Sequence, residues 1–141
     1  ADVVVNHRNP LRKEFDDQKL ADVDYVFHTW DLDNDYLGQL VNIAKPFAKI
    51  AYISPAPGTD LGATFIKAQQ LVPEFMFARP MHGVDQERQG EILNIAAKLI
   101  DEGTIVHTAA KIEKFSLNAI KEGHKTLASG KSIGKLAYTL E

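Results

Sequence analysis

Two short apolar segments flank an amphipathic one within Val23–Ser54, and this order limits the possible folds more than any other feature of the sequence. Val23–His28 and Lys49–Ser54 are rich in β-branched and aromatic residues, which is typical of strands. Between them, apolar residues recur at helical spacing as far as Ala44, and Pro46 ends the pattern. Strand, helix and strand within about thirty residues form one βαβ unit with parallel strands. The carboxyl ends of both strands are therefore expected at one edge of a sheet, where open α/β sheets bind ligands.

The rest of the chain predicts further strands and amphipathic helices. Val3–Val5 is a β-branched run typical of a strand buried on both faces. Leu71–Ala78 predicts another strand, and Pro73 within it indicates an edge position or a bend at its start. The remaining predicted elements are a short helix at Leu11–Leu20, a helix capped by Asp60, an amphipathic helix at Gln86–Glu102 closed by Gly103, an extended segment from Ile105 to Phe115, a helix capped by Ser116, and a closing strand at Leu136–Leu140.

Composition excludes several classes of function. The 141 residues suffice for one ordinary domain, and the net charge of −3 comes with no basic stripe, so nucleic acid is not an expected partner. No apolar run reaches the length of a membrane span, so no membrane association is expected. The chain has no cysteine, which excludes disulfides and thiolate metal sites and favours a cytoplasmic location. Because the chain opens inside a predicted strand without Met, we expect a fragment of a longer protein.

Several local patterns resemble ligand-binding motifs without meeting their requirements. Gly130–Lys135 has its glycines one residue too close for a phosphate loop and follows a helix rather than a strand. The acidic run Asp31–Asp35 lacks the central Gly and the later Glu of an EF-hand loop. Phe75–Phe77 predicts a packed strand, with a cofactor wall as the alternative. The histidines have no metal-ligand spacing, and only His28, at the end of a strand, is weighed as lining a site.

The order of the segments resembles that of a known superfamily. The segments that carry the likeness are Ala1–His7, Val23–Phe27, Lys49–Ile53, Glu74–Arg79, Gly103–Ile105 and Leu127–Leu136. Together they resemble the C-terminal part, less than half, of the medium-chain dehydrogenase/reductase superfamily, near its zinc-type alcohol dehydrogenase-like and quinone oxidoreductase branch. The resemblance implies an α/β fold: a partial Rossmann-like parallel sheet (family strands three to six) with helices on both faces, in residues 1–103. Residues 104–141 would be the C-terminal tail of a GroES-like catalytic domain.

The resemblance also implies a reaction and a cofactor. Family members transfer hydride between NAD(P)H and a carbonyl or activated alkene, and the cofactor here would be NADP or NAD, without zinc in this branch. The positions that match cofactor contacts are Phe27, His28, Thr29, Ile53, Ser54, Met76, Phe77 and Ala78, with Lys131 as a weaker candidate. The glycine-rich phosphate turn and the N-terminal catalytic domain are not in this chain, so its catalytic residues cannot be named. We therefore expect the chain alone to bind cofactor poorly and to be inactive.

The same resemblance predicts a partner. The sixth family strand pairs with its twin, which implies a homodimer through the edge strand Glu74–Ala78. Val3–Val5 would lack its family neighbours, so we expect either a rearranged N-terminal strand or strand exchange between copies. The alternative function is a non-catalytic α/β module for dimerisation or ligand binding. A flavodoxin-like domain is a third class, for which the turn Asn6–Asn9 is a poor phosphate cradle because it lacks Gly.

Overall fold

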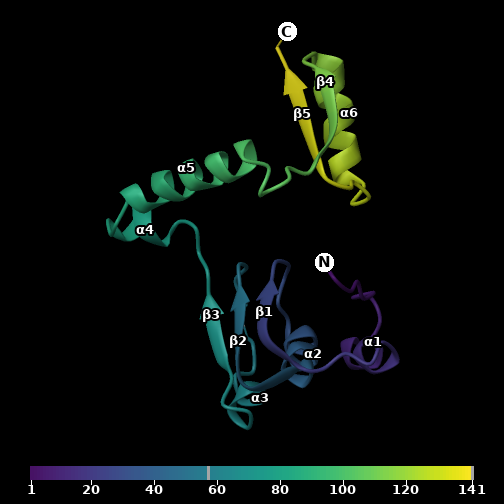
Figure 1. Cartoon of the computed structure of the whole chain (residues 1–141), viewed down its shortest axis with the longest axis vertical. Helices are drawn as coiled ribbons and strands as arrows, with labels where there is room; N and C mark the ends of the chain where they lie inside the picture. Colours follow the sequence, from purple (N-terminus) through teal and green to yellow (C-terminus); the bar gives the residue numbers. More distant parts are fainter. Residues whose placement is uncertain (57, 141) are drawn as a thin grey trace. The chain divides into compact units, whose positions relative to one another are not determined.

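The computed structural model describes residues 1–56 and 58–140, which form two compact units, Ala1–His82 and Gly83–Glu141. Both units combine helices with parallel strands (Figure 1). The predicted α/β class is thereby confirmed. The predicted division into residues 1–103 and 104–141 concerns the domains of full-length family members, and it stays a prediction. No helix in the described ranges is long and apolar enough to cross a membrane.

The first unit is built on a three-stranded parallel sheet in the order β1-β2-β3. In the register of this sheet His28 lies opposite Tyr52, and Tyr52 lies opposite Pro73, so the carboxyl ends of the strands are level. This arrangement confirms the predicted βαβ unit. The elements of the unit are α1 (Leu11–Asp17), β1 (Val23–His28), α2 (Asn34–Ile43), β2 (Ala44–Tyr52), α3 (Gly62–Phe65), β3 (Gln70–Pro73) and α4 (Ala78–His82).

The core of this unit lies on one face of the sheet. Leu37 of α2 and Ile50 of β2 are almost completely buried, and α1 adds Leu11 to the same cluster. Because side chains alternate along a strand, the opposite face carries Tyr25 and Phe27, which are exposed. Helices α1 and α2 therefore pack on the buried face of this sheet. The long helices α5 (Glu87–Asp101) and α6 (Leu117–Ala128) belong to the second unit.

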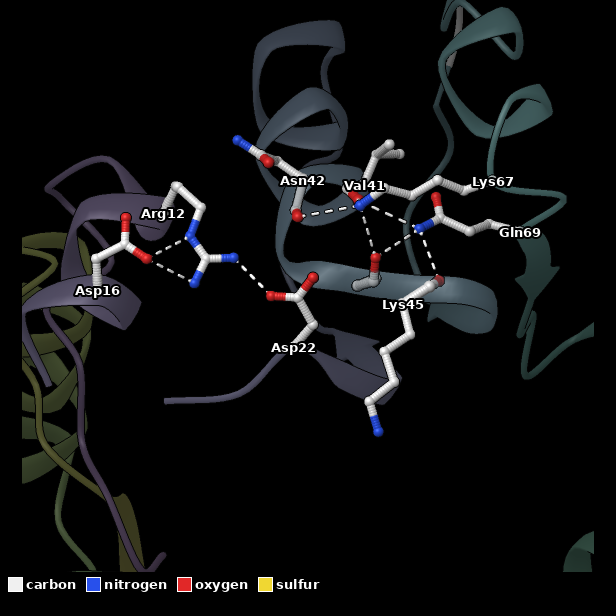
Figure 2. Close-up of polar contacts among 9 residues, drawn as sticks. Arg12, Asp16, Asp22, Val41, Asn42, Lys45, Lys67 and Gln69 are labelled. Carbon is white, nitrogen blue, oxygen red and sulfur yellow. Dashed lines mark hydrogen bonds and ion pairs between the residues drawn. The ribbon is translucent and has the colours of Figure 1, made fainter. Parts of the chain in front are cut away.

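A polar clamp holds the carboxyl end of α2 (Figure 2). The Lys67 ammonium donates to the carbonyls of Val41, Asn42 and Ala44 at 2.9, 3.1 and 2.9 Å. The Gln69 amide donates to the carbonyls of Val41, Ala44 and Lys45 at 3.2, 3.0 and 3.1 Å. The last carbonyls of a helix have no partner within the helix, and a cation there also complements the helix dipole. The clamp therefore satisfies the carbonyls where the chain turns from α2 into β2.

One predicted strand is wrong, and another is longer in the prediction than in the structure. Val3–Val5 has no strand conformation; Val3 and Val4 are exposed, and the Val4 carbonyl accepts a long 3.4 Å bond from the Gln18 side chain. A run of three residues forms a strand only beside a neighbour that pairs with its backbone, and no described strand pairs with this run. The predicted strand exchange between copies stays a prediction.

The strand predicted at Leu71–Ala78 is present only in its first part. β3 ends at Pro73, and one further ladder bond joins the Glu74 N–H to the Tyr52 carbonyl at 2.8 Å. β2 ends at Tyr52, so the residues after Glu74 have no strand to pair with. They turn instead into α4, with the Ala78 N–H donating to the Phe75 carbonyl at 2.9 Å. The edge strand Glu74–Ala78 predicted for a dimer is thus a turn and the start of a helix, although β3 itself lies at the edge of the sheet.

The second unit contains α5, β4 (Ala109–Lys114), α6 (Leu117–Ala128) and β5 (Lys135–Thr139), with β4 and β5 parallel. The predicted helix cap is confirmed, because the Ser116 hydroxyl accepts from the Ala119 N–H at 3.1 Å. The Tyr138 hydroxyl of β5 donates to the Ala119 carbonyl of α6 at 3.2 Å. Gly123 of α6 is buried at this contact. A Cβ atom at this position would lie 2.0 Å from the Tyr138 hydroxyl oxygen, so the contact has room only for glycine. Helix α6 therefore packs on β5 through a glycine.

Candidate functional site

The candidate site is the edge of the first unit where β1 and β2 end. The turn that leaves β1 is held by His28, the last residue of the strand, which is 8% exposed. Its Nε2 lies 3.1 Å from the Asp31 carbonyl oxygen, and its ring packs against Tyr36 with centroids 5.0 Å apart. A carbonyl only accepts, so Nε2 carries the proton and donates. His28 therefore fixes the turn from inside.

The segment that leaves β2 is tied to the same turn. The Ser54 hydroxyl donates to the Trp30 carbonyl at 2.6 Å. The Asn34 side-chain amide donates to the Gly58 carbonyl at 3.1 Å, and the Asp60 N–H donates to the Asn34 side-chain oxygen at 2.6 Å. The two loops at this edge of the sheet are thus joined by three hydrogen bonds. These contacts restrict the loops before any ligand arrives.

The groups that face solvent at this edge are mainly aromatic and apolar. Trp30 is 76% exposed, and Phe27 and Ile53 are also exposed. Thr29, which directly precedes Trp30 in the chain, adds an exposed hydroxyl. A shallow hollow of about 420 Å³ adjoins the turn and is lined by Asp31, Leu32, Asp33 and Pro55. Asp33 also caps α2, accepting from the Tyr36 N–H at 2.7 Å. The edge therefore offers flat apolar surface, a hydroxyl and carboxylates, a set that suits a heteroaromatic ring bearing a ribose.

The structure brings together five of the residues predicted to bind the cofactor: Phe27, His28, Thr29, Ile53 and Ser54. The side chains of His28 and Ser54 are engaged by backbone carbonyls, as described above. Whether any of the five contacts a ligand stays a prediction. The sequence analysis missed Trp30, although it directly follows Thr29 and an aromatic residue at a strand exit was a readable signal.

The other predicted site residues belong to two further segments, one that follows β3 and one in the second unit. Met76, Phe77 and Ala78 follow β3 in the turn to α4, where the Phe75 and Phe77 rings meet edge to face at 5.6 Å. Lys131 is exposed in the second unit, after α6. That unit has its own hollow of about 430 Å³ between α6 and β5, and Lys131 does not line it. Their role in binding a cofactor stays a prediction.

Charge interactions that move pKa values lie elsewhere. Hydrogen bonds from the Asn9 side-chain amide and the Asn6 N–H lower the pKa of Glu14 on α1. A hydrogen bond with Glu113 raises the pKa of Lys111 on β4, and one with Asp22 raises that of Arg12 on α1. In residues 1–56 and 58–140, no group of three or more His, Asp or Glu side chains could hold a metal ion.

A family model described as zinc-binding dehydrogenase matches residues 1–137 of the chain. The chain belongs to the zinc-binding dehydrogenase family. A zinc-type alcohol dehydrogenase-like protein of Staphylococcus epidermidis is 35% identical over 144 residues, which cover all of this chain and 43% of that protein. A zinc-type alcohol dehydrogenase-like protein of Staphylococcus aureus is 32% identical and is covered to 42%. The chain thus spans less than half the length of these relatives.

Solved structures agree with this assignment. A putative zinc-dependent alcohol dehydrogenase protein of Rhizobium etli superposes with a TM-score of 0.79 at 25% identity, over 96% of this chain and 40% of that one. CurA of Vibrio vulnificus, solved in complex with NADPH, superposes with a TM-score of 0.62 at 15% identity, over 97% of this chain and 43% of CurA, and shows likeness of fold alone. The predicted resemblance to the C-terminal part of the medium-chain dehydrogenase/reductase superfamily is confirmed.

Proposed function

We propose that this zinc-binding dehydrogenase chain carries part of the nicotinamide-dinucleotide site of an NAD(P)H-dependent oxidoreductase. The enzyme would be zinc-type alcohol dehydrogenase-like or quinone reductase-like and would transfer hydride to or from a carbonyl or activated alkene. The observation that carries the proposal is the joined pair of loops at the carboxyl ends of β1 and β2, tied by the Ser54–Trp30 hydrogen bond. In open parallel sheets this edge is where nucleotides bind.

The residues at this edge have separate roles in the proposal. Phe27 and Ile53 form an apolar wall, and the Thr29 hydroxyl hydrogen-bonds ribose or carboxamide groups. Met76, Phe77 and Ala78, which follow the third strand, extend the wall, and Lys131 is a further candidate from the second unit. The cofactor, when bound, supplies the hydride chemistry. The protein side chains orient its ring and exclude water from one face.

The choice of cofactor and partners belongs to the same proposal. Among the structural neighbours, CurA was solved with NADPH, and another, 19% identical with a TM-score of 0.67, is an NAD-dependent alcohol dehydrogenase. Either NADP or NAD suits the edge described here, because none of the side chains assigned to it above addresses a ribose phosphate. We further propose that the enzyme is cytoplasmic, acts without zinc, and forms a homodimer through the β3 edge of its sheet.

The test uses the gene product that carries this chain. Oxidation of NADPH and NADH is followed by absorbance with a quinone, an enone and an aldehyde as acceptors. We expect turnover with one cofactor, and we expect Ile53→Asp to raise its KM strongly, because a carboxylate would interrupt the apolar wall. Phe47→Leu is the matched control, since Phe47 is an exposed aromatic near the start of β2, at the other end of the strand. Absence of cofactor binding and of turnover would overturn the proposal.

The second candidate is a non-catalytic α/β module. It is favoured by the open face of the sheet, on which Tyr25 and Phe27 are exposed. Under either candidate we expect calorimetry to detect no micromolar binding of NADPH or NADH to the isolated chain, because the helix terminus that holds the pyrophosphate is not part of this sequence. The gene product that carries this chain separates the two. Concentration-dependent dimerisation of the gene product without any cofactor binding would favour the module instead.

A further inference from the structure

The turn between β1 and α2 presents the single tryptophan of the chain to solvent. Exposing a large aromatic side chain to water is unfavourable in free energy, yet Trp30 is 76% exposed. Its backbone is nevertheless held on both sides: Ser54 donates to its carbonyl at 2.6 Å, and His28 donates to the carbonyl of Asp31 at 3.1 Å. Two side chains from two strand ends thus fix the turn that displays an indole ring.

The charge around this turn selects among possible ligands. The hollow beside it is lined by Asp31, Leu32, Asp33 and Pro55, which bring two carboxylates and no basic side chain. A phosphate would meet repulsion here, whereas a cationic ring would be attracted. A cation over an indole face gains further from the ring quadrupole, and tryptophan is the best aromatic residue for this contact.

We propose that Trp30 stacks on the positively charged ring of oxidised nicotinamide, with Asp31 beside it, and that His28 and Ser54 are positioning residues that hold the Trp30 turn. This inference rests on the proposed function and deepens it by naming the group that recognises the ring. It also changes the predicted role of two residues, because His28 and Ser54 act through the turn rather than on the cofactor.

The experiment exploits the single indole group. The Trp30 Nε1–H gives one resonance in a proton–nitrogen correlation spectrum of the chain, and the probes are the methylnicotinamide cation and neutral nicotinamide. We expect a saturable shift of this resonance with the cation and a weaker one with the neutral ring. Free N-acetyltryptophanamide under the same conditions gives the reference for unspecific contact.

Variants separate stacking from general surface effects. Trp30→Leu should raise the dissociation constant of the cation, read from the Ile53 amide, by about two- to fivefold. Tyr25→Leu is the matched control, an exposed aromatic on β1 away from its carboxyl end, and should leave the constant unchanged. Ser54→Ala should reduce the preference for the cation over neutral nicotinamide, and Ser54→Thr, which restores a hydroxyl, should recover it.

The outcomes distinguish this inference from the proposed function. A saturable cation shift that Trp30→Leu weakens and Tyr25→Leu does not supports stacking. In a second outcome, nicotinamide mononucleotide shifts the Ile53 and Ser54 amide resonances saturably, while the Trp30 indole resonance shifts no more than that of free N-acetyltryptophanamide. This outcome would support cofactor binding at the edge and would overturn the role of Trp30. If no resonance of the chain shifts saturably with any probe, both the role of Trp30 and the cofactor edge of this chain are overturned.

Discussion

The clamp at the end of α2 gives a prediction whose size follows from the hydrogen bonds that each carbonyl accepts. Lys67→Met keeps the apolar stem and removes the ammonium that contacts the carbonyls of Val41, Asn42 and Ala44. The carbonyls of Val41 and Ala44 still accept from the Gln69 amide, so only that of Asn42 loses its side-chain donor. A hydrogen bond to a charged group contributes about 1.5–3 kcal/mol. We expect the free energy of unfolding of the first unit to fall by about 2 kcal/mol.

The decisive quantity is the coupling between Lys67 and Gln69. Gln69→Leu alone leaves the Lys67 ammonium on Val41 and Ala44, and it also removes the buried Gln69 Oε1, which has no hydrogen-bond partner among the described residues. We expect a loss of about 1 kcal/mol from this change. In the double variant the carbonyls of Val41 and Ala44 lose both donors, so the loss should exceed the sum of the single losses by about 1–2 kcal/mol.

The assay is urea unfolding followed by the native methyl resonance of Ile50, which is fully buried in this unit. Extrapolation to water gives the free energy of unfolding for each variant. Lys98→Met is the control, because Lys98 is an exposed lysine 3.7 Å from Glu102 on α5 and should change stability by less than about 0.5 kcal/mol. Additive losses in the double variant, or a Lys67→Met variant as stable as Lys98→Met, would refute the clamp.

Three further predictions concern other parts of the chain. Hydrogen bonds from the Asn9 side chain and the Asn6 N–H lower the pKa of Glu14 below its ordinary value of 4.5. The contribution of Glu14 to holding residues 6–9 is therefore present above pH 4.5 and is lost as the pH falls through the lowered pKa. A titration that follows the Glu14 carboxyl carbon should show the low midpoint, and Asn9→Ala should raise that midpoint. Ser116→Ala should cost the second unit about 1 kcal/mol in thermal unfolding, and equal unfolding curves for the variant and the parent would contradict the cap. Gly123→Ala should destabilise that unit despite the higher helix propensity of Ala, because its Cβ meets the Tyr138 hydroxyl, and Tyr138→Phe should recover part of the loss; an unchanged melting temperature would contradict the close packing.

Local chemistry made much of the fold readable from the sequence. The βαβ unit follows from apolar spacing between Val23 and Ser54, and α2 indeed ends at Ile43, before Pro46. The Ser116 cap and the end of α5 before Gly103, which has a φ of 72°, are likewise set within a few residues. In each case the interaction partners are neighbours in the chain, so the pattern itself carries the information.

Strand pairing and the hydrogen-bond partners of some polar side chains were decided only by the tertiary structure, because the groups that interact are distant in the sequence. Val3–Val5 has strand propensity but no neighbouring backbone, and Glu74–Ala78 passes the end of β2, so neither run is a strand. The sequence alone placed His28 and Ser54 at the ligand edge, whereas the fold directs their hydrogen bonds to the turn around Trp30. Local propensity specifies which conformations a segment favours. Pairing and the use of each polar group are settled only when residues far apart in the chain meet.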